Sequence, residues 1–165
     1  MNRITRILVP TDFSETSDAA LIYARQLAGS LGASLHLVHV FDDPYGDALV
    51  AEVSASVYES MRASAIAAAR RELMRRLPSE DRQRFRGSSA MVTGLAADAI
   101  VQYAADHSMD LIVMGTHGRS GFAHLLLGSV AEQVVRSAHC PVLTVRAGAV
   151  EQDQEVAEEA VAAVA

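Results

Sequence analysis

Short apolar runs alternate along this chain with longer segments in which apolar residues recur every three or four positions. The apolar runs, which we interpret as strands, cover residues 4–10, 33–41, 88–93, 110–115 and 141–146. The helical pattern covers residues 13–31, 58–77, 95–107 and 129–137. Every strand except the last is therefore followed by a helix. This alternation predicts a parallel sheet with right-handed crossovers and helices on both faces.

The length and the charge distribution favour one folded domain with an acidic tail. A chain of 165 residues is long enough for a single domain with a substantial core. Residues 149–165 hold five of the 20 acidic residues and no basic one, so residues 1–148 carry 14 arginines against 15 acidic residues, a net charge of −1. We expect a domain over residues 1–148 and an exposed tail over residues 149–165 that adds little to stability.

The composition excludes several classes of protein. The chain has no lysine, which rules out Schiff-base enzymes and Walker A nucleotidases. Its single cysteine, Cys140, cannot form an intramolecular disulfide or, by itself, a thiolate zinc site. No apolar run approaches the roughly 18 to 20 residues of a membrane span, and no signal peptide is recognisable. We therefore expect a cytoplasmic protein that does not enter a membrane.

Arginines cluster between residues 62 and 86, where eight of them outnumber three acidic residues. Such a segment could bind nucleic acid, but it lacks the repeated interleaving of aromatic residues that stacks on bases, with Phe85 alone among the arginines. The apolar stripe of the same helix is expected to face the core, so we interpret the arginines as a solvated helix face. The nearly neutral domain likewise gives no electrostatic reason to expect a nucleic-acid partner.

A glycine-rich segment after the fourth strand carries the clearest chemical signal. It runs Met114-Gly115-Thr116-His117-Gly118-Arg119-Ser120-Gly121, and Gly128-Ser129-Val130 begins the next helix. Gly115 and Gly118 would permit positive φ and a close approach of the backbone to an anion, and a helix N-terminus suits phosphate. The alternative is that the glycines only form turns and that Ser129 only caps its helix.

A second candidate element follows the first strand, at Pro10-Thr11-Asp12-Phe13-Ser14-Glu15. In an open parallel sheet this segment would stand beside the glycine-rich loop if the first and fourth strands are neighbours. Asp12 could then accept hydrogen bonds from ribose hydroxyls or from a base amine. The alternative is a capping box in which Asp12 and Glu15 stabilise the following helix.

Together these segments closely resemble the universal stress protein family. The likeness rests on residues 10–15, 39–40, 110–121, 126–132 and 140–146, and it extends over residues 4–146. It includes the spacing Gly-x2-Gly-x9-Gly-Ser, formed by Gly115, Gly118, Gly128 and Ser129, that distinguishes the ATP-binding branch. The resemblance implies a single-domain, Rossmann-like α/β fold with an open, five-stranded parallel sheet of order 3-2-1-4-5.

The resemblance also implies where ATP would bind. Adenine would lie between the ends of the first and second strands, near the backbone of Val40, with Asp12 beside the base or the ribose. Gly115 would pack by the ribose, and the phosphates would lie against the glycine-rich loop and the following helix. A divalent cation, Mg or Mn, would be held mainly by the phosphates. The residues implied to contact the nucleotide are Pro10, Thr11, Asp12, Val40, Met114, Gly115, His117, Gly118, Arg119, Gly128, Ser129 and Val130.

The final strand is the expected site of self-association. In the order 3-2-1-4-5 it lies at an edge of the sheet, and residues Val142 to Val145 are uncharged and have high β-propensity. Unpaired backbone groups at such an edge favour pairing with a second copy, and members of the family commonly pair there. We therefore expect a homodimer formed through this strand.

These observations lead to a functional hypothesis with two alternatives. We expect an ATP-binding stress-response regulatory protein, in which nucleotide occupancy sets conformation or the choice of an unidentified protein partner. No general base is evident and no catalytic residue is assigned, so hydrolysis would at most be slow. One alternative is an adenylate-forming or ATP pyrophosphatase-like enzyme, although such enzymes carry a Ser-Gly-Gly-x-Asp-Ser type loop that this chain lacks. The other is a nucleotide-free interaction module, which Ala131 allows because some ATP-binding members have a hydroxyl there.

Overall fold

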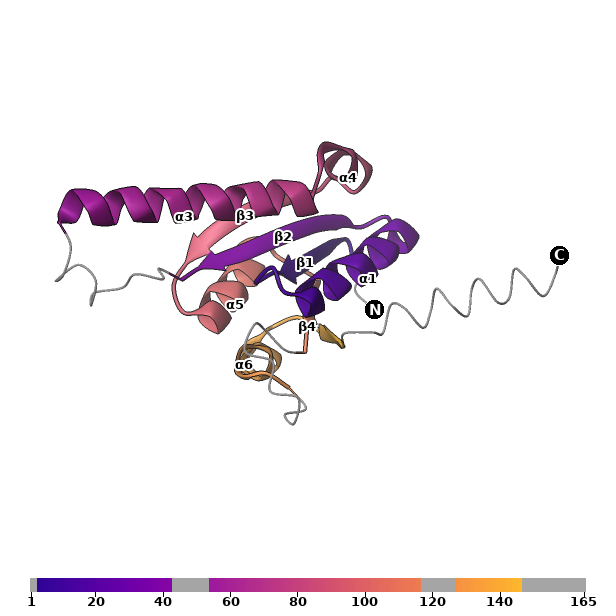
Figure 1. Ribbon diagram of the computed structural model, residues 1–165. Coiled ribbons are helices and arrows are strands. Elements are labelled where there is room, and N and C mark those ends of the chain that lie inside the picture. The colour runs from indigo at the N-terminus through magenta and orange to yellow at the C-terminus, as the bar shows by residue number, and fades with distance from the viewer. Residues whose placement is uncertain (1–2, 43–53, 117–126, 147–165) are drawn as a thin grey trace.

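The computed structural model describes residues 3–42, 54–116 and 127–146 (Figure 1). Its elements are β1 (Arg6–Pro10), α1 (Glu15–Leu31), β2 (Ser34–Phe41), α3 (Ala55–Arg76), α4 (Ser79–Arg84), β3 (Ser88–Thr93), α5 (Ala96–Asp106), β4 (Leu111–Gly115), α6 (Ser129–Ser137) and β5 (Val142–Val145). All five predicted strands and all four predicted helices are present, with ends that shift by a few residues. The sequence patterns missed only α4 among these elements, because its six polar residues show no apolar period.

The five strands form one parallel sheet in the order β3-β2-β1-β4-β5, as the resemblance implied. From β1 the next two strands, β2 and β3, are added toward one edge of the sheet. The fourth strand, β4, lies on the other side of β1. The reversal between β1 and β4 opens a crevice at their carboxyl ends, where α/β sheets of this kind bind ligands.

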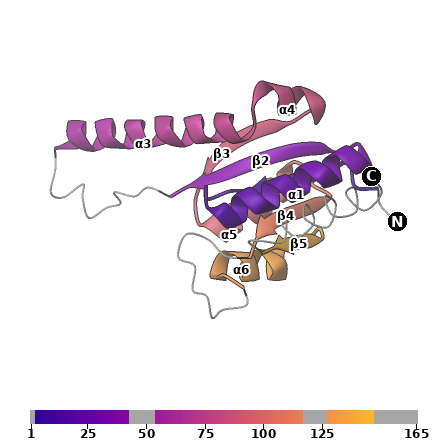
Figure 2. The same ribbon diagram turned by 45° about the vertical axis from the view of Figure 1, so that its right-hand side comes forward.

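Helices cover both faces of the sheet, and each face has its own apolar core (Figure 2). On one face Ile7 and Val9 of β1 pack with residues of α1 and α3. On the other face Leu8 of β1 packs with residues of α5 and α6. Successive residues of a strand point to opposite faces, so one central strand contributes to both cores. None of the helices in the described ranges is long and apolar enough to cross a membrane.

The histidines of β2 follow the same alternation, as their odd spacing predicts. The ring of His39 stacks on Phe13 near the start of α1, whereas the ring of His36 meets Tyr103 of α5. These two histidines therefore lie on opposite faces of the sheet and cannot share a metal ion.

The prediction of a solvated arginine face on α3 is wrong at Arg76. Its side chain is only 10% exposed and forms ion pairs with Asp18 of α1 and with Glu72. Arg75, its neighbour in sequence, is 71% exposed and pairs with Glu72 of the same helix. Periodicity places Arg76 on the helix but does not reveal that α1 lies within reach of its guanidinium.

Candidate functional site

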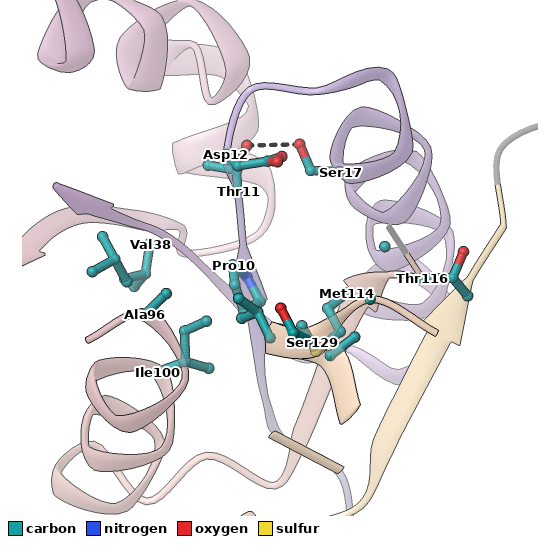
Figure 3. A pocket seen from close by; sticks show the side chains of 15 residues that line it. Pro10, Thr11, Asp12, Ser17, Val38, Ala96, Ile100, Met114, Thr116 and Ser129 are labelled. Atoms are coloured by element: carbon teal, nitrogen blue, oxygen red, sulfur yellow. Dashed lines mark hydrogen bonds between the residues drawn. The ribbon is translucent and has the colours of Figure 1, made fainter. Parts of the chain in front are cut away.

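A cavity of about 170 Å3 opens at the carboxyl ends of β1, β2 and β4, beside the N-terminal ends of α5 and α6 (Figure 3). It occupies the crevice formed by the reversal of strand order between β1 and β4. The residues that line it are Pro10, Thr11, Asp12, Ser17, Val38, Val40, Ala96, Ile100, Met114, Gly115, Thr116, Gly128, Ser129, Val130 and Ala131.

The pocket has an apolar wall and a polar rim. Figure 3 shows Val38 of β2 together with Ala96 and Ile100 of α5 on one side of the cavity. Thr11 and Asp12 lie on another side, at the end of β1. Aliphatic side chains can bury the faces of a flat ring, while a few placed polar groups fix its orientation. The arrangement therefore suits a ligand with one apolar, planar part and one hydrophilic part.

Local hydrogen bonds hold the turn that carries Asp12. The N–H and Oγ of Ser14 both donate to Asp12 Oδ1, at 3.1 and 2.5 Å. Ser14 is the N-cap of α1, and its Oγ accepts from the N–H of Ser17 at 3.3 Å. The capping box predicted for Asp12 and Glu15 is thus wrong. Asp12 lies two residues before the cap, where its carboxylate closes a turn onto Ser14 instead.

Thr11 anchors the same turn to the sheet and to α1. Its N–H donates to the carbonyl of Val38 at 2.8 Å, which continues the pairing of β1 with β2 by one residue. Its Oγ1 lies 3.0 Å from Ser17 Oγ and accepts from the N–H of Phe13 at 3.0 Å. The Thr11 side chain is buried, so it shapes the turn from within.

The start of α6 forms the opposite side of the pocket. Gly128 is its N-cap, with φ −71° and ψ 155°, and the N–H of Gly128 donates to the carbonyl of Thr116 at 2.7 Å. Ser129 is the first helical residue and makes no capping bond, so the alternative that it only caps the helix is wrong. The first N–H groups of a helix have no intrahelical acceptor and carry the positive end of its dipole. This end of the pocket can therefore attract an anion.

Gly115 has a role that differs from the predicted one. Its φ is not positive, unlike those of Gly32 and Gly94. A Cβ added at Gly115 would lie 2.9 Å from the backbone carbon and oxygen of Thr16 in α1, a distance that real Cβ atoms essentially never show. The glycine is required because the end of β4 packs directly on α1.

Nine of the predicted contact residues line the cavity: Pro10, Thr11, Asp12, Val40, Met114, Gly115, Gly128, Ser129 and Val130. The other three, His117, Gly118 and Arg119, lie outside the described residues. Sequence reasoning missed Ser17, Val38, Ala96, Ile100, Thr116 and Ala131. Two signals could have found some of them. Val38 shares a strand face with Val40, and the first turn of α5 must begin at the carboxyl edge of a parallel sheet.

Residues that could ligate a metal do not gather at the pocket. Within the described ranges, no three or more His, Cys, Asp or Glu side chains are placed to hold a metal ion together. The predicted divalent cation therefore stays a prediction in which phosphate oxygens supply most of the ligands.

Comparison with known proteins decides the family. The sequence matches the universal stress protein family over residues 3–146. The chain belongs to the universal stress protein family. It is 34% identical over 146 residues to universal stress protein MJ0531 of Methanocaldococcus jannaschii, covering 88% of this chain and 84% of that protein. Universal stress protein MJ0577 of the same organism is 32% identical over 152 residues, covering 86% and 94%.

Solved structures agree with this assignment. The structure of MJ0577 matches this universal stress protein with a TM-score of 0.74 at 29% identity, covering 88% of this chain and 97% of that one. Universal stress protein UspA from Lactobacillus plantarum gives 0.69 at 28% identity, covering 88% and 100%. A universal stress protein in complex with cAMP gives 0.61 at 25% identity, covering 89% and 100%.

Proposed function

We propose that this universal stress protein binds an adenine nucleotide, ATP in the first place, in the pocket between β1, β4 and α6. Occupancy of the pocket would regulate the contact of the protein with a partner in the stress response. The observation that carries the proposal is the meeting of Asp12 and the N-terminus of α6 in one cavity that also has an aliphatic wall, formed by Val38, Ala96 and Ile100.

The chemistry of the lining matches the three parts of a nucleotide. The apolar wall suits the faces of a purine, and a strand backbone near Val40 can pair with its polar edge. Asp12 supplies carboxylate oxygens at the pocket, and such oxygens accept hydrogen bonds from hydroxyl groups like those of ribose. The start of α6 suits phosphate oxygens. The structure of a related universal stress protein with cAMP supports an adenine nucleotide as the ligand.

The phosphates of ATP need more positive charge than the described lining supplies. The described lining contains one carboxylate, Asp12, and no arginine or histidine. We propose that Mg or Mn bridges the phosphates, and that His117, Gly118 and Arg119 of the glycine-rich loop complete their surroundings. The cation would neutralise the clustered phosphate oxygens and draw most of its ligands from them.

Isothermal titration with ATP, ADP and AMP tests the proposal. We expect Asp12→Asn to weaken all three by about tenfold, or about 1.4 kcal/mol, because the base and ribose are common to them. Removing divalent cations with a chelator should weaken ATP far more than AMP, which lacks the β and γ oxygens. Asp98→Asn is the matched control, because Asp98 is an exposed carboxylate on α5 outside the pocket lining.

Other results would support the alternatives. Failure of all three nucleotides to bind would favour a nucleotide-free interaction module. Release of pyrophosphate from ATP in the presence of an acceptor would favour an adenylate-forming or pyrophosphatase-like enzyme. Equal weakening of ATP and AMP by the chelator would show that the assignment of a phosphate-bound cation is wrong.

A further inference from the structure

Arg76, at the last residue of α3, contacts the pocket turn from outside the pocket. Its Nη2 donates to the carbonyl of Phe13 at 3.1 Å, and its guanidinium carbon lies 4.9 Å from the centre of the Phe13 ring. Its Nε and Nη2 donate to the two carboxylate oxygens of Asp18 at 2.6 and 3.1 Å. Its Nη1 donates to Glu72. A single side chain of α3 thus contacts both Phe13, the residue after Asp12, and Asp18 in the first turn of α1.

The contacted residue has a backbone conformation that needs support. Phe13 has φ +66°, in the left-handed region that is unfavourable for a residue with a Cβ. Two side chains contact its ring. His39 stacks on the ring with ring centres 4.2 Å apart, and the guanidinium of Arg76 lies over the ring. His39 Nδ1 also bonds to the carbonyl of Thr11 at 2.8 Å. None of Phe13, His39 and Arg76 lines the pocket, so the ring and carbonyl contacts of Phe13 support the turn from outside the pocket.

The charges around Arg76 keep it in place. Burial by itself would lower the pKa of Arg76, but its hydrogen bonds to Asp18 and Glu72 outweigh burial and raise that pKa. The guanidinium therefore stays cationic and keeps its planar set of donors directed at two carboxylates and one carbonyl.

We propose that Arg76 is a positioning residue for the nucleotide pocket, which fixes the turn at Asp12 and Phe13 from α3 and thereby sets nucleotide affinity. The proposal rests on the proposed function. Arg76 does not line the pocket, so it acts through the turn and makes no contact with the ligand. Because energetic coupling is reciprocal, a nucleotide that orders the turn also strengthens the attachment of the last turn of α3.

Removing the Arg76 side chain should leave α3 attached to the body. Leu73 and Leu77 are buried in the core shared with α1. Arg25 of α1 also donates to the carbonyl of Arg76 and forms an ion pair with Asp81. These contacts do not use the Arg76 guanidinium, so Arg76→Gln is expected to fold. Arg75→Gln is the matched control, because Arg75 is exposed and, among the described residues, its side chain bonds only Glu72.

Hydrogen exchange in the protein without nucleotide tests the turn directly. The N–H groups of Phe13 and Ser14 are bonded to Thr11 Oγ1 and Asp12 Oδ1. We expect Arg76→Gln to speed their exchange by about tenfold and Arg75→Gln to leave it unchanged. Unchanged exchange in Arg76→Gln would overturn the proposal whether or not nucleotides bind.

Titration with ATP then tests affinity through a double-mutant cycle. We expect Arg76→Gln to weaken ATP about threefold to tenfold, and Asp12→Asn to cost much less in the Arg76→Gln background than in the wild type. If Arg76→Gln only lowered the free energy of unfolding, the losses of ATP-binding free energy caused by Arg76→Gln and Asp12→Asn would add, provided that binding is measured well below the melting temperature. Additive effects, or equal affinities of Arg76→Gln and Arg75→Gln, would overturn this proposal alone. A wild-type protein that bound no adenine nucleotide would instead overturn the proposed function, together with the role of Arg76 in affinity.

Discussion

At the scale of single residues, Gly115 shows how a motif glycine can be required for packing and not for a special backbone angle. Its backbone does not need positive φ, yet the backbone of Thr16 occupies the space that a Cβ would fill. We predict that Gly115→Ala lowers the free energy of unfolding by about 1 to 3 kcal/mol, because the end of β4 must move away from α1. Urea denaturation at neutral pH measures this loss.

Gly29 in α1 is the matched control for Gly115. A Cβ there would lie 3.9 Å from Phe85 Cε1, an ordinary van der Waals contact, and the residue lies inside a helix. Gly29→Ala should therefore stabilise the protein by about 0.5 to 1 kcal/mol. Equal stabilities of Gly115→Ala and Gly29→Ala would contradict the packing role assigned to Gly115.

At the scale of elements, Asp110 joins the amino ends of two neighbouring strands. Its Oδ2 accepts from the N–H and Oγ1 of Thr5, at 2.8 and 2.7 Å, and from the N–H of Arg6 at 3.0 Å. Arg6 begins β1 and Thr5 directly precedes it, and Asp110 directly precedes β4. Burial pushes the pKa of Asp110 upward, but these hydrogen bonds outweigh it and hold the pKa below its ordinary value.

The direction of this pKa shift gives a pH dependence of stability. A carboxyl whose pKa is lowered by folding stabilises the protein above its unfolded pKa of about 3.9 and loses that effect as the pH falls through its folded pKa. We predict that Asp110→Asn costs about 1 kcal/mol at pH 7 and that its difference from the wild type narrows below about pH 4. Urea midpoints between pH 3 and pH 7 measure both effects. Asp106→Asn is the control for the loss of a surface carboxylate, because Asp106 accepts from Gln102 of its own helix, and it should cost less than Asp110→Asn at pH 7.

At the scale of the whole molecule, β5 is the strand through which we propose that two copies pair. It lies at the sheet edge beyond β4, and most of its residues are only partly buried in the single chain. We predict a dimeric mass by light scattering at micromolar concentration. Thr144→Lys should shift the mass toward the monomer, because a charge on an edge strand opposes pairing with another edge.

The other edge of the same sheet provides the control for the dimer. Thr93 ends β3, is exposed, and lies at the opposite edge from β5. Thr93→Lys should therefore leave the mass unchanged. A monomeric wild type, or a dimer that dissociates in Thr93→Lys but not in Thr144→Lys, would show that β5 is not the interface.

The sequence by itself determined the elements and the sheet class, because these depend on local patterns, while the resemblance to the family implied nine of the residues that line the pocket. Apolar period distinguishes helix from strand over a few residues, and strict alternation of strand and helix leaves few topologies. The order 3-2-1-4-5, expected from the family, makes the first and fourth strands neighbours. Because neighbouring parallel strands end at the same edge of the sheet, the segments after β1 and β4 meet there. Among the helices and strands of the described residues, only α4, which has no apolar period, was not predicted.

Tertiary structure alone decided how individual groups are used. Arg76 and Phe13 are 63 residues apart in sequence, and only the packing of α3 beside α1 brings them together. In the same way, the backbone of Thr16 determines why position 115 must be glycine. The shift of the helix cap from Asp12 to Ser14 depends on backbone angles that a short motif leaves open. Contacts between distant segments depend on how whole elements pack, and no local pattern contains that information.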